Sequence, residues 1–281
     1  QFYHFNFSFA QLFCLLVIVM KNPKEKISAV VIAFNEMGYI ERCIESVEFA
    51  DEIIVVDGGS TDRTKDIAKM WGAKVVSNPF TGFSDQRNFA LSKASSVWSL
   101  FIDSDEALTP ELKSRLMDIS EEDDPHSLYR IMRTEYLLGR EVKFGHGKSD
   151  YQERFFKTKD VRYEGTVHEY PLIKGVKLSP QSDLVADFPP SLRLLHDPDK
   201  DMKESIKRLG AYSILKAKQK IDQGRKVSAL EVVTTCPITL LRISLKSWRD
   251  GRRGLLAALM EAMHRTLVKL LVYENNEFNK N

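Results

Sequence analysis

The sequence predicts an α/β fold: a doubly wound, mostly parallel sheet with a small antiparallel extension and a C-terminal helical region. Three observations lead to this prediction. Short β-branched runs alternate with amphipathic segments from Ile27 onward, which is the order found in parallel sheets built from strand–helix–strand units. Residues 127–188 hold aromatic and Arg-rich runs interrupted by glycines. From Asp201 onward, apolar residues recur at helical spacing.

The first part of the chain contains four short apolar runs that we predict to be buried strands. They lie at Ile27–Ala33, Glu52–Val56, Lys74–Ser77 and Val97–Ile102. The segments between and after them predict helices over residues 36–49, from residue 61 or 62 to Trp71, over residues 85–94, and after Thr109-Pro110. We expect Asn35 to cap the first helix and Gly72 to stop the second.

The antiparallel extension is expected to consist of short strands that complete the same domain. Its turns are predicted at Gly139, Gly145-His146-Gly147, Gly165 and Gly175. Pro189-Pro190 marks a boundary, and helices are predicted near residues 201–222, 227–235, 238–249 and 254–273. The chain is therefore divided into an α/β domain over residues 21–199 and a basic, amphipathic helical region over residues 200–281.

Residues 1–20 are expected to be a non-native or hydrophobic leader. The apolar run from Phe9 to Met20 is shorter than the ~20 residues that span a bilayer, and it lacks the basic leader and cleavage site of a secretory signal. We favour Met20 as the natural start, with residues 1–19 an upstream addition. The alternative is an anchor that dips into a membrane.

The composition is that of a globular protein with an uneven charge distribution. The 281 residues are 43% hydrophobic and 28% charged, which excludes a disordered chain. The net charge of +2 hides a basic end, because residues 200–281 carry 17 Lys/Arg against 8 Asp/Glu. A basic end on an acidic body favours a polyanionic partner or an anionic membrane face.

The cysteines predict neither a disulfide framework nor a zinc site. Cys14, Cys43 and Cys236 are odd in number, and no pair has the spacing of zinc ligands. We expect buried or free thiols.

Polar clusters follow three of the predicted strands. They are Asn35-Glu36, Asp57 to Asp62, and Asp103 to Glu106. Ligands of doubly wound sheets bind at the carboxyl ends of the strands, so this placement predicts a binding site. Two carboxylates one residue apart, Asp103 and Asp105, suit a hard cation such as Mg²⁺ or Mn²⁺. The alternative for this cluster is a capped turn.

The cluster after the second strand combines two glycines with carboxylates. Gly58-Gly59 permits a tight turn and a close approach of the backbone to a ligand, and Asp57 could accept hydrogen bonds from a base or ribose. The alternative is an ordinary turn with a helix cap, which is the role expected for Asp62. After the first strand, Ala33 to Glu36 stands where a dinucleotide fold requires G-x-G-x-x-G, which argues against NAD or FAD.

These segments resemble family-2 inverting glycosyltransferases of the GT-A fold. The resemblance rests on Val30 to Glu36, Val55 to Thr64, Gln86-Arg87-Asn88 and Asp103 to Glu106, and it covers roughly residues 27–200. Within that family the chain is most similar to lipopolysaccharide-core β-1,4-glucosyltransferases. The segments that carry this narrower similarity are Asp103 to Leu108, Glu153 to Phe156, Gly165 to Glu169 and Asp250 to Gly254.

The resemblance implies a site for a UDP-sugar. Asp57 would contact the uracil, and the nucleotide pocket would be lined by Ala33, Asn35 and Glu36. Arg87 would lie near the diphosphate.

The resemblance also implies a metal and a general base. Asp103 would face the ribose and the metal, Mg²⁺ or Mn²⁺, and Asp105 would bind that metal directly. The family's base is usually in an E-D pair after the metal motif. This chain has His168-Glu169 instead, so the base is assigned to Glu169, with Glu153 or Asp150 as the fallback. His196 matches a C-terminal metal- or diphosphate-binding histidine of related folds, or else is structural.

The expected activity is transfer of a hexose, with glucose as first candidate, from the UDP-sugar to a lipopolysaccharide inner core or another membrane-linked saccharide. A polyprenyl-linked or protein acceptor stays open. The alternatives are a nucleotidyltransferase, which would usually show a Gly-rich basic loop after the first strand, and a non-catalytic scaffold. No nucleic-acid partner is expected.

The apolar stripe within residues 254–273, with its accompanying basic residues, indicates a helix that lies in a membrane interface. Packing on the catalytic domain or on another subunit is the alternative. We expect the protein in the cytoplasm, peripheral on the inner face of the cytoplasmic membrane.

Overall fold

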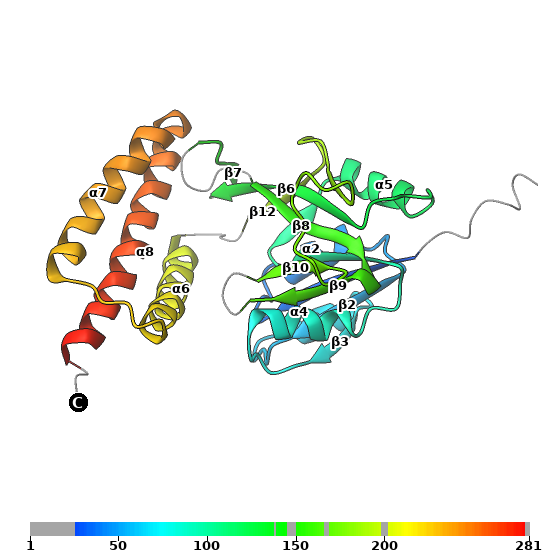
Figure 1. The fold of residues 1–281 in the computed structure, drawn as a ribbon, viewed down its shortest axis with the longest axis horizontal. Coiled ribbons are helices and arrows are strands. Elements are labelled where there is room, and N and C mark those ends of the chain that lie inside the picture. Colours follow the sequence, from blue (N-terminus) through cyan, green and yellow to red (C-terminus); the bar gives the residue numbers. More distant parts are fainter. Residues whose placement is uncertain (1–25, 138, 145–149, 166–168, 198–201, 279–281) are drawn as a thin grey trace, which may run out of the picture.

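The chain forms an α/β domain followed by three long helices (Figure 1). The structure is a computed structural model and describes residues 26–137, 139–144, 150–165, 169–197 and 202–278. The expected leader, Cys14, the turn at Gly145 to Gly147 and His168 lie outside these residues. The α/β architecture agrees with the fold class that the sequence predicts.

Four parallel strands make the first half of the main sheet. They are β1 (Ile27–Ala33), β2 (Glu52–Asp57), β3 (Lys74–Ser77) and β4 (Trp98–Asp103), and they lie in the order β3-β2-β1-β4. Their bounds agree with the prediction to within one residue. Because all four strands are parallel, their polar carboxyl ends meet at the same edge of the sheet.

Alternate residues of β1 build two hydrophobic cores. Ala29 and Val31 belong to the core on one face, which is covered by α2 (Ile40–Ser46), α3 (Thr64–Met70) and α5 (Pro110–Ile119). Val30 belongs to the core on the other face, under α4 (Phe83–Leu91). Side chains of a strand point alternately to opposite faces, so β1 is buried on both sides, and its single polar residue, Ser28, is buried as well.

The first helix is shorter than predicted. It begins at Ile40 rather than at residue 36, and its N-cap position is Tyr39 rather than Asn35. Asn35 has a left-handed backbone with φ of 57°, which asparagine tolerates better than most residues but which no helical position allows. The second predicted helix ends as expected, because Gly72, with φ of 78°, follows it.

The antiparallel extension completes the same domain by joining the main sheet. Strand β8 (Asp150–Lys157) pairs antiparallel with both β4 and the ten-residue β6 (Leu128–Leu137). Three further strands complete the far end: β5 (Glu106–Leu108), β11 (Val185–Asp187) and β12 (Arg193–His196). The short β7 (Arg140–Glu141) pairs with the end of β6, and β9 (Val161–Glu164) with β10 (Tyr170–Ile173) forms a separate hairpin.

The C-terminal region consists of α6 (Met202–Asp222), α7 (Ala229–Ser247) and α8 (Gly251–Phe278). The predicted break between residues 235 and 238 is wrong, because α7 continues through Pro237. Helices α7 and α8 approach closely at Gly254, where an added Cβ would lie 1.9 Å from the carbonyl oxygen of Ser247. No helix within the described residues is both long and apolar enough to span a bilayer.

Candidate active site

The site lies at the carboxyl edge of the parallel strands, as the sequence predicts. Asp57 pairs with Ala33 across β2 and β1, and Asp103 pairs with Ile32 across β4 and β1. The two carboxylates therefore end strands on either side of β1 at nearly the same level.

The loops after β1 and β2 hold each other through side-chain-to-backbone hydrogen bonds. The backbone N–H of Asn35 donates to Ser60 Oγ over 2.8 Å, and Asn35 Oδ1 accepts from the N–H of Thr61 over 2.9 Å. The N–H of Glu36 donates to Thr64 Oγ1 over 2.8 Å. These bonds fix the expected nucleotide-lining residues against the Gly58-Gly59 turn.

Asp57 is fully buried and shapes its own turn. Its carboxylate accepts from the backbone N–H of Gly59 over 3.0 Å and from that of Ser60 over 3.0 and 3.2 Å. Gly59 has φ of 107°, a conformation that favours glycine. The cluster therefore forms the tight turn that was expected as one alternative. Asp62 has the local role expected of it, because its carboxylate accepts a hydrogen bond from the N–H of Thr64 over 2.9 Å.

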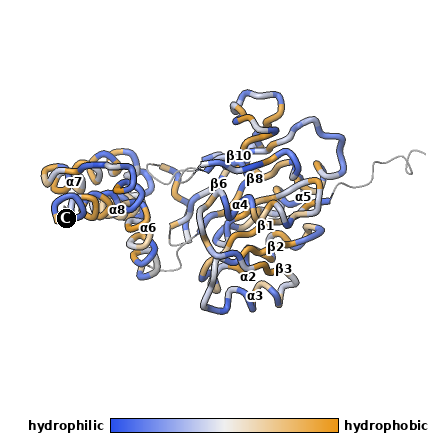
Figure 2. Tube along the Cα trace, turned by 60° about the horizontal axis from the view of Figure 1, so that its bottom comes forward, coloured by the Kyte–Doolittle hydropathy of each residue, from blue (hydrophilic) through white to orange (hydrophobic). Residues whose placement is uncertain are grey.

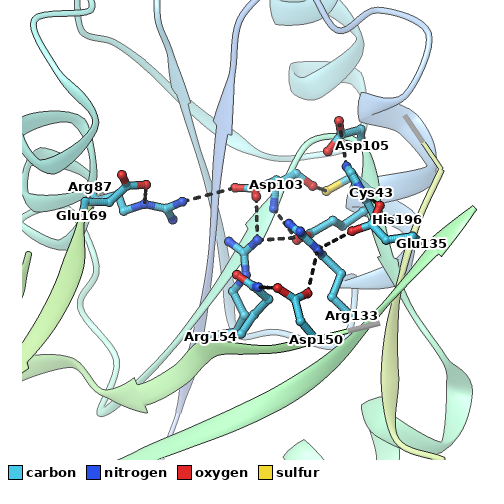
Figure 3. A network of polar contacts seen from close by, with 12 residues as sticks. Cys43, Arg87, Asp103, Asp105, Arg133, Glu135, Asp150, Arg154, Glu169 and His196 are labelled. Atoms are coloured by element: carbon cyan, nitrogen blue, oxygen red, sulfur yellow. Dashed lines mark hydrogen bonds and ion pairs between the residues drawn. The ribbon is translucent and has the colours of Figure 1, made fainter. Parts of the chain in front are cut away.

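Asp103 stands in a network of arginines and acids (Figure 3). Arg154 NH2 donates to Asp103 Oδ2 over 2.6 Å and to Glu106 Oε1 over 2.8 Å. Burial would raise the pKa of Asp103, but Arg154 and Arg87 hold it well below its ordinary value. Burial raises the pKa of Glu106 above its ordinary value, against the opposing effect of Arg154. Asp103 is therefore an anion at neutral pH.

A β-bulge directs Arg154 into this network. Tyr129 pairs with Phe155, and the next residue of β6, Arg130, pairs with Glu153, so that Arg154 is the extra residue on β8. Bulges commonly re-aim a side chain next to a functional site. The side chain of Arg154 is only 4% exposed, and it is a site residue that sequence reasoning missed.

Arg87 connects Asp103 with Glu169. Arg87 NH2 lies 3.6 Å from Asp103 Oδ1, and Arg87 Nε donates to Glu169 Oε1 over 3.3 Å. The guanidinium lies over the rings of Phe101 and Tyr163, at 5.6 and 5.3 Å from their centroids. The structure thus brings together the expected diphosphate-binding arginine, the metal-motif aspartate and the expected base.

Asp105 faces His196 on a second branch of the site. His196 Nε2 lies 3.4 Å from Asp105 Oδ2, and His196 Nδ1 contacts Glu135 Oε2 over 2.5 Å. Burial opposes the charged imidazole, but the hydrogen bonds to Asp105 and Glu135 raise the pKa of His196 to about 10. Burial likewise acts against ionisation of Asp105, whereas His196 and Arg208 lower its pKa. The pair is therefore a charged carboxylate beside an imidazolium.

The side chains at this place are of the types that bind a divalent cation. Two carboxylates and an imidazole are ligands that Mn²⁺ accepts, and Mg²⁺ accepts the carboxylates. The Asp105–His196 distance lets both residues face one ion, although His196 must first lose its proton. Among the described residues, no three side chains of the metal-binding types are gathered around one point. Asp103 lies against Arg87 and Arg154, and Asp105 lies against Arg208.

The two fallback bases lie on β8. Asp150 Oδ1 is 3.8 Å from Arg133 Nε, which extends the acidic and basic network away from Asp103. Burial raises the pKa of Glu153, and Arg130 and Lys177 oppose this. Glu169, unlike either of them, is joined to Asp103 through a single arginine.

Cys43 and Cys236 are free thiols, as expected. Cys43 is buried beneath the site and its Sγ donates to the carbonyl oxygen of Asp103 over 3.5 Å. Burial raises the pKa of this thiol well above its ordinary value, so it is an uncharged part of the core.

Comparison with known families and proteins finds relatives of this chain. Residues 28–174 match the family model described as glycosyl transferase family 2. The chain is 29% identical to the lipopolysaccharide core biosynthesis glycosyltransferase LpsC of Rhizobium meliloti, over 90% of this chain and 94% of that protein. It is 31% identical to an uncharacterized glycosyltransferase of Rickettsia felis, over 75% of each chain.

Solved structures give more distant similarities. A crystal structure of glucosyl-3-phosphoglycerate synthase from Mycobacterium tuberculosis in complex with Mn²⁺, UDP and glucosyl-3-phosphoglycerate is 26% identical, with a TM-score of 0.34. The similarity covers 48% of this chain and 51% of that one. A structure of the same synthase with Mg²⁺ and UDP is 23% identical, with a TM-score of 0.37, over 56% of this chain and 63% of that one.

Proposed function

This chain belongs to glycosyl transferase family 2, and from that premise we propose that it is an inverting hexosyltransferase that uses a UDP-sugar donor. Glucose is the first candidate for the transferred hexose. The observation that carries the proposal is the convergence of Asp103, Arg87 and Glu169 at the carboxyl edge of the sheet. These groups suit a reaction in which a diphosphate leaves and a hydroxyl loses its proton.

The donor is proposed to bind across the end of β1. Ala33, Asn35, Glu36 and Asp57 line the nucleotide, and the fixed loop geometry around Ser60 supports this assignment. Asp57 has its carboxylate engaged by backbone N–H groups and positions the turn. Because it is fully buried, its proposed contact with the uracil requires the Gly58-Gly59 turn to shift when the donor binds.

Asp103, Asp105 and His196 are proposed to hold Mg²⁺ or Mn²⁺ together with the donor. Such an ion, when bound, stabilises negative charge on the leaving diphosphate. Arg87 adds a guanidinium fork to that stabilisation, and its stacking on Phe101 and Tyr163 keeps it extended toward Asp103.

Glu169 is proposed as the general base. It accepts the proton of an acceptor hydroxyl, whose oxygen bonds to the anomeric carbon as the bond from that carbon to the diphosphate oxygen breaks. A single displacement from the opposite face inverts the configuration. Glu169 is ion-paired with Arg87, so the guanidinium occupies one oxygen of the proposed base. Transfer of Arg87 to the donor phosphates would free this oxygen for the acceptor hydroxyl when the donor binds.

The acceptor is proposed to be a lipopolysaccharide inner-core saccharide or another membrane-linked saccharide. Similarity to LpsC over nearly the whole of both chains supports this class. A polyprenyl-linked or protein acceptor is the alternative within the same chemistry.

A peripheral location on the inner face of the cytoplasmic membrane is proposed as well. Helix α7 and the residue directly after it expose six large apolar side chains, each between 52% and 73% exposed: Leu230, Val233, Ile238, Leu241, Leu245 and Trp248. Exposed Arg242, Lys246 and Arg249 follow three members of this α7 stripe by one residue each. Figure 2 shows hydrophobic segments along both α7 and α8, but the stripe on α7 is the more exposed.

A donor screen tests the proposed reaction. Hydrolysis of UDP-glucose, UDP-galactose, UDP-N-acetylglucosamine and GDP-mannose is measured with Mn²⁺ and with EDTA. The proposal expects metal-dependent release of UDP from at least one UDP-hexose. Release of pyrophosphate from a nucleoside triphosphate, with no hydrolysis of any nucleotide sugar, would support a nucleotidyltransferase instead.

A further inference from the structure

Arg208 on α6 reaches out of the C-terminal helical region into the site. Its NH1 donates to Asp105 Oδ2 over 3.0 Å, and its NH2 donates to Glu36 Oε2 over 2.8 Å. Its guanidinium lies 5.0 Å from the centroid of the Tyr39 ring. Glu36 and Asp105 are separated from Arg208 by 172 and 103 residues, so only the tertiary fold brings the three together.

The two acids held by Arg208 are both assigned to the donor site. Glu36 follows β1 and is expected to line the nucleotide pocket, and Asp105 is expected to bind the metal. Burial disfavours the charged guanidinium, but Glu36 and Asp105 raise the pKa of Arg208 above its ordinary value. The arginine thus supplies positive charge where the donor complex would bring a cation.

We propose that Arg208 is a donor-binding residue: it neutralises Asp105 and Glu36 in the ligand-free protein and moves onto the diphosphate when the donor binds. This inference rests on the proposed function. It makes the C-terminal helical region a part of the donor site rather than a separate appendage.

The exchange follows from the charges around one oxygen. Asp105 Oδ2 faces both Arg208 NH1 and His196 Nε2. A divalent cation on Asp105 would repel the guanidinium of Arg208, which favours its release of this carboxylate. A diphosphate delivered at the same time offers several oxygens, and the planar guanidinium fork binds phosphate through two parallel hydrogen bonds.

A purely structural role predicts a different outcome. If Arg208 only fastens α6 to the catalytic domain, its loss lowers the stability of the fold and affects all ligands equally. If it binds the diphosphate, its loss affects UDP, which has the β-phosphate, more than UMP, which lacks it. The comparison of these two nucleotides separates the roles.

The experiment uses the full chain and isothermal titration calorimetry. UDP and UMP are titrated in the presence of Mn²⁺ into the wild type, Arg208→Ala, Arg208→Lys and the control Lys207→Ala, whose side chain is exposed on the same helix. Hydrogen bonds between charged groups are the strong ones, so we expect Arg208→Ala to weaken UDP binding by about tenfold or more. UMP binding should change much less, Arg208→Lys should lie between, and Lys207→Ala should match the wild type.

Three results overturn the proposal in distinguishable ways. Equal UDP affinity in the wild type and Arg208→Ala overturns the role of Arg208 and leaves the proposed function standing. Equal loss of UDP and UMP affinity, with a lower midpoint of thermal unfolding, makes Arg208 a structural anchor only. A wild-type chain that binds no UDP with Mn²⁺ overturns the proposed donor together with this inference.

Discussion

Arg154 lies 2.6 Å from Asp103 although 51 residues separate them in the sequence. The same guanidinium holds Glu106, which is fully buried. Arg154 therefore keeps two carboxylates in place beneath the proposed donor, and its own charge is compensated by both of them. The triad of Asp103, Glu106 and Arg154 thus fixes the position of Asp103 in the site.

Replacing Arg154 by methionine should destabilise the fold strongly. Removal of one partner from a buried ion pair leaves uncompensated charge and costs about 3–5 kcal/mol. Urea unfolding measures the change, with Arg162→Met on exposed β9 as the control. An unchanged free energy of unfolding in Arg154→Met would contradict the central place given to this triad.

The change Glu169→Gln should lower turnover by about 10²-fold or more, which is the usual scale for loss of a general base. Steady-state transfer from the donor identified in the screen provides the measurement. Glu164→Gln, at an exposed position of β9, should be close to the wild type. If Glu153→Gln or Asp150→Asn is the severe variant instead, the base is misassigned.

Glu52 connects the amino ends of β1, β2 and β4, at the edge of the sheet opposite the site. Its Oε1 accepts from Ser28 Oγ and from the N–H of Ser95, over 2.6 Å for the latter. Burial raises the pKa of Glu52, but the hydrogen bonds from Ser28, Ser95 and Ser96 lower it below its ordinary value. Glu52→Gln should cost about 1–2 kcal/mol of stability at pH 7.

The sign of the pH dependence follows from that lowered pKa. The unfolded chain takes up a proton near pH 4.3 and folded Glu52 only below that. The stabilisation is therefore complete above about pH 4.3 and is lost as the pH falls through the folded pKa. Urea unfolding at pH 7 and pH 3.5 should show the gap between wild type and Glu52→Gln shrinking in acid. A gap that is equally wide at both values would contradict this account, and Glu45→Gln serves as the exposed control.

The α7 stripe should bind anionic membranes. Sedimentation with phosphatidylglycerol vesicles should recover the wild type and not the double variant Leu241→Asp/Leu245→Asp, whose positions are 63% and 69% exposed. High salt should reduce the binding because the basic flank contributes to it. Val176→Asp, on an equally exposed apolar side chain of the catalytic domain, is the control. Undiminished sedimentation of the double variant would remove α7 from the membrane contact.

The strand ends were predictable from the sequence because two local rules determine them. Each of these apolar runs ends where a carboxylate or amide residue appears, and parallel strands bring such ends to one edge. The convergence of Asp57 and Asp103 on the end of β1 needs no further information. The extent of the first helix was not predictable in this way. The side chain of Asn35 accepts a hydrogen bond from the N–H of Thr61 instead of capping the helix.

The arginines of the site were harder to foresee. Arg154 reaches Asp103 only because β8 inserts beside β4 and carries a bulge, and neither feature has a local signal. Arg208 belongs to a helix whose pattern predicts only amphipathic packing. The continuity of α7 through Pro237 was also missed, since a proline lowers helix propensity but tertiary packing against α8 can offset it.

The role of Asp105 tests the account most directly. UDP release from the preferred UDP-sugar is measured with saturating Mn²⁺ for the wild type and Asp105→Ala, with circular dichroism and thermal unfolding as checks on the fold. We expect Asp105→Ala to keep its fold and to lose transfer, because the carboxylate that faces His196 and Arg208 is gone. Turnover near the wild-type rate in a folded Asp105→Ala protein would contradict a metal-assisted glycosyl transfer at this site.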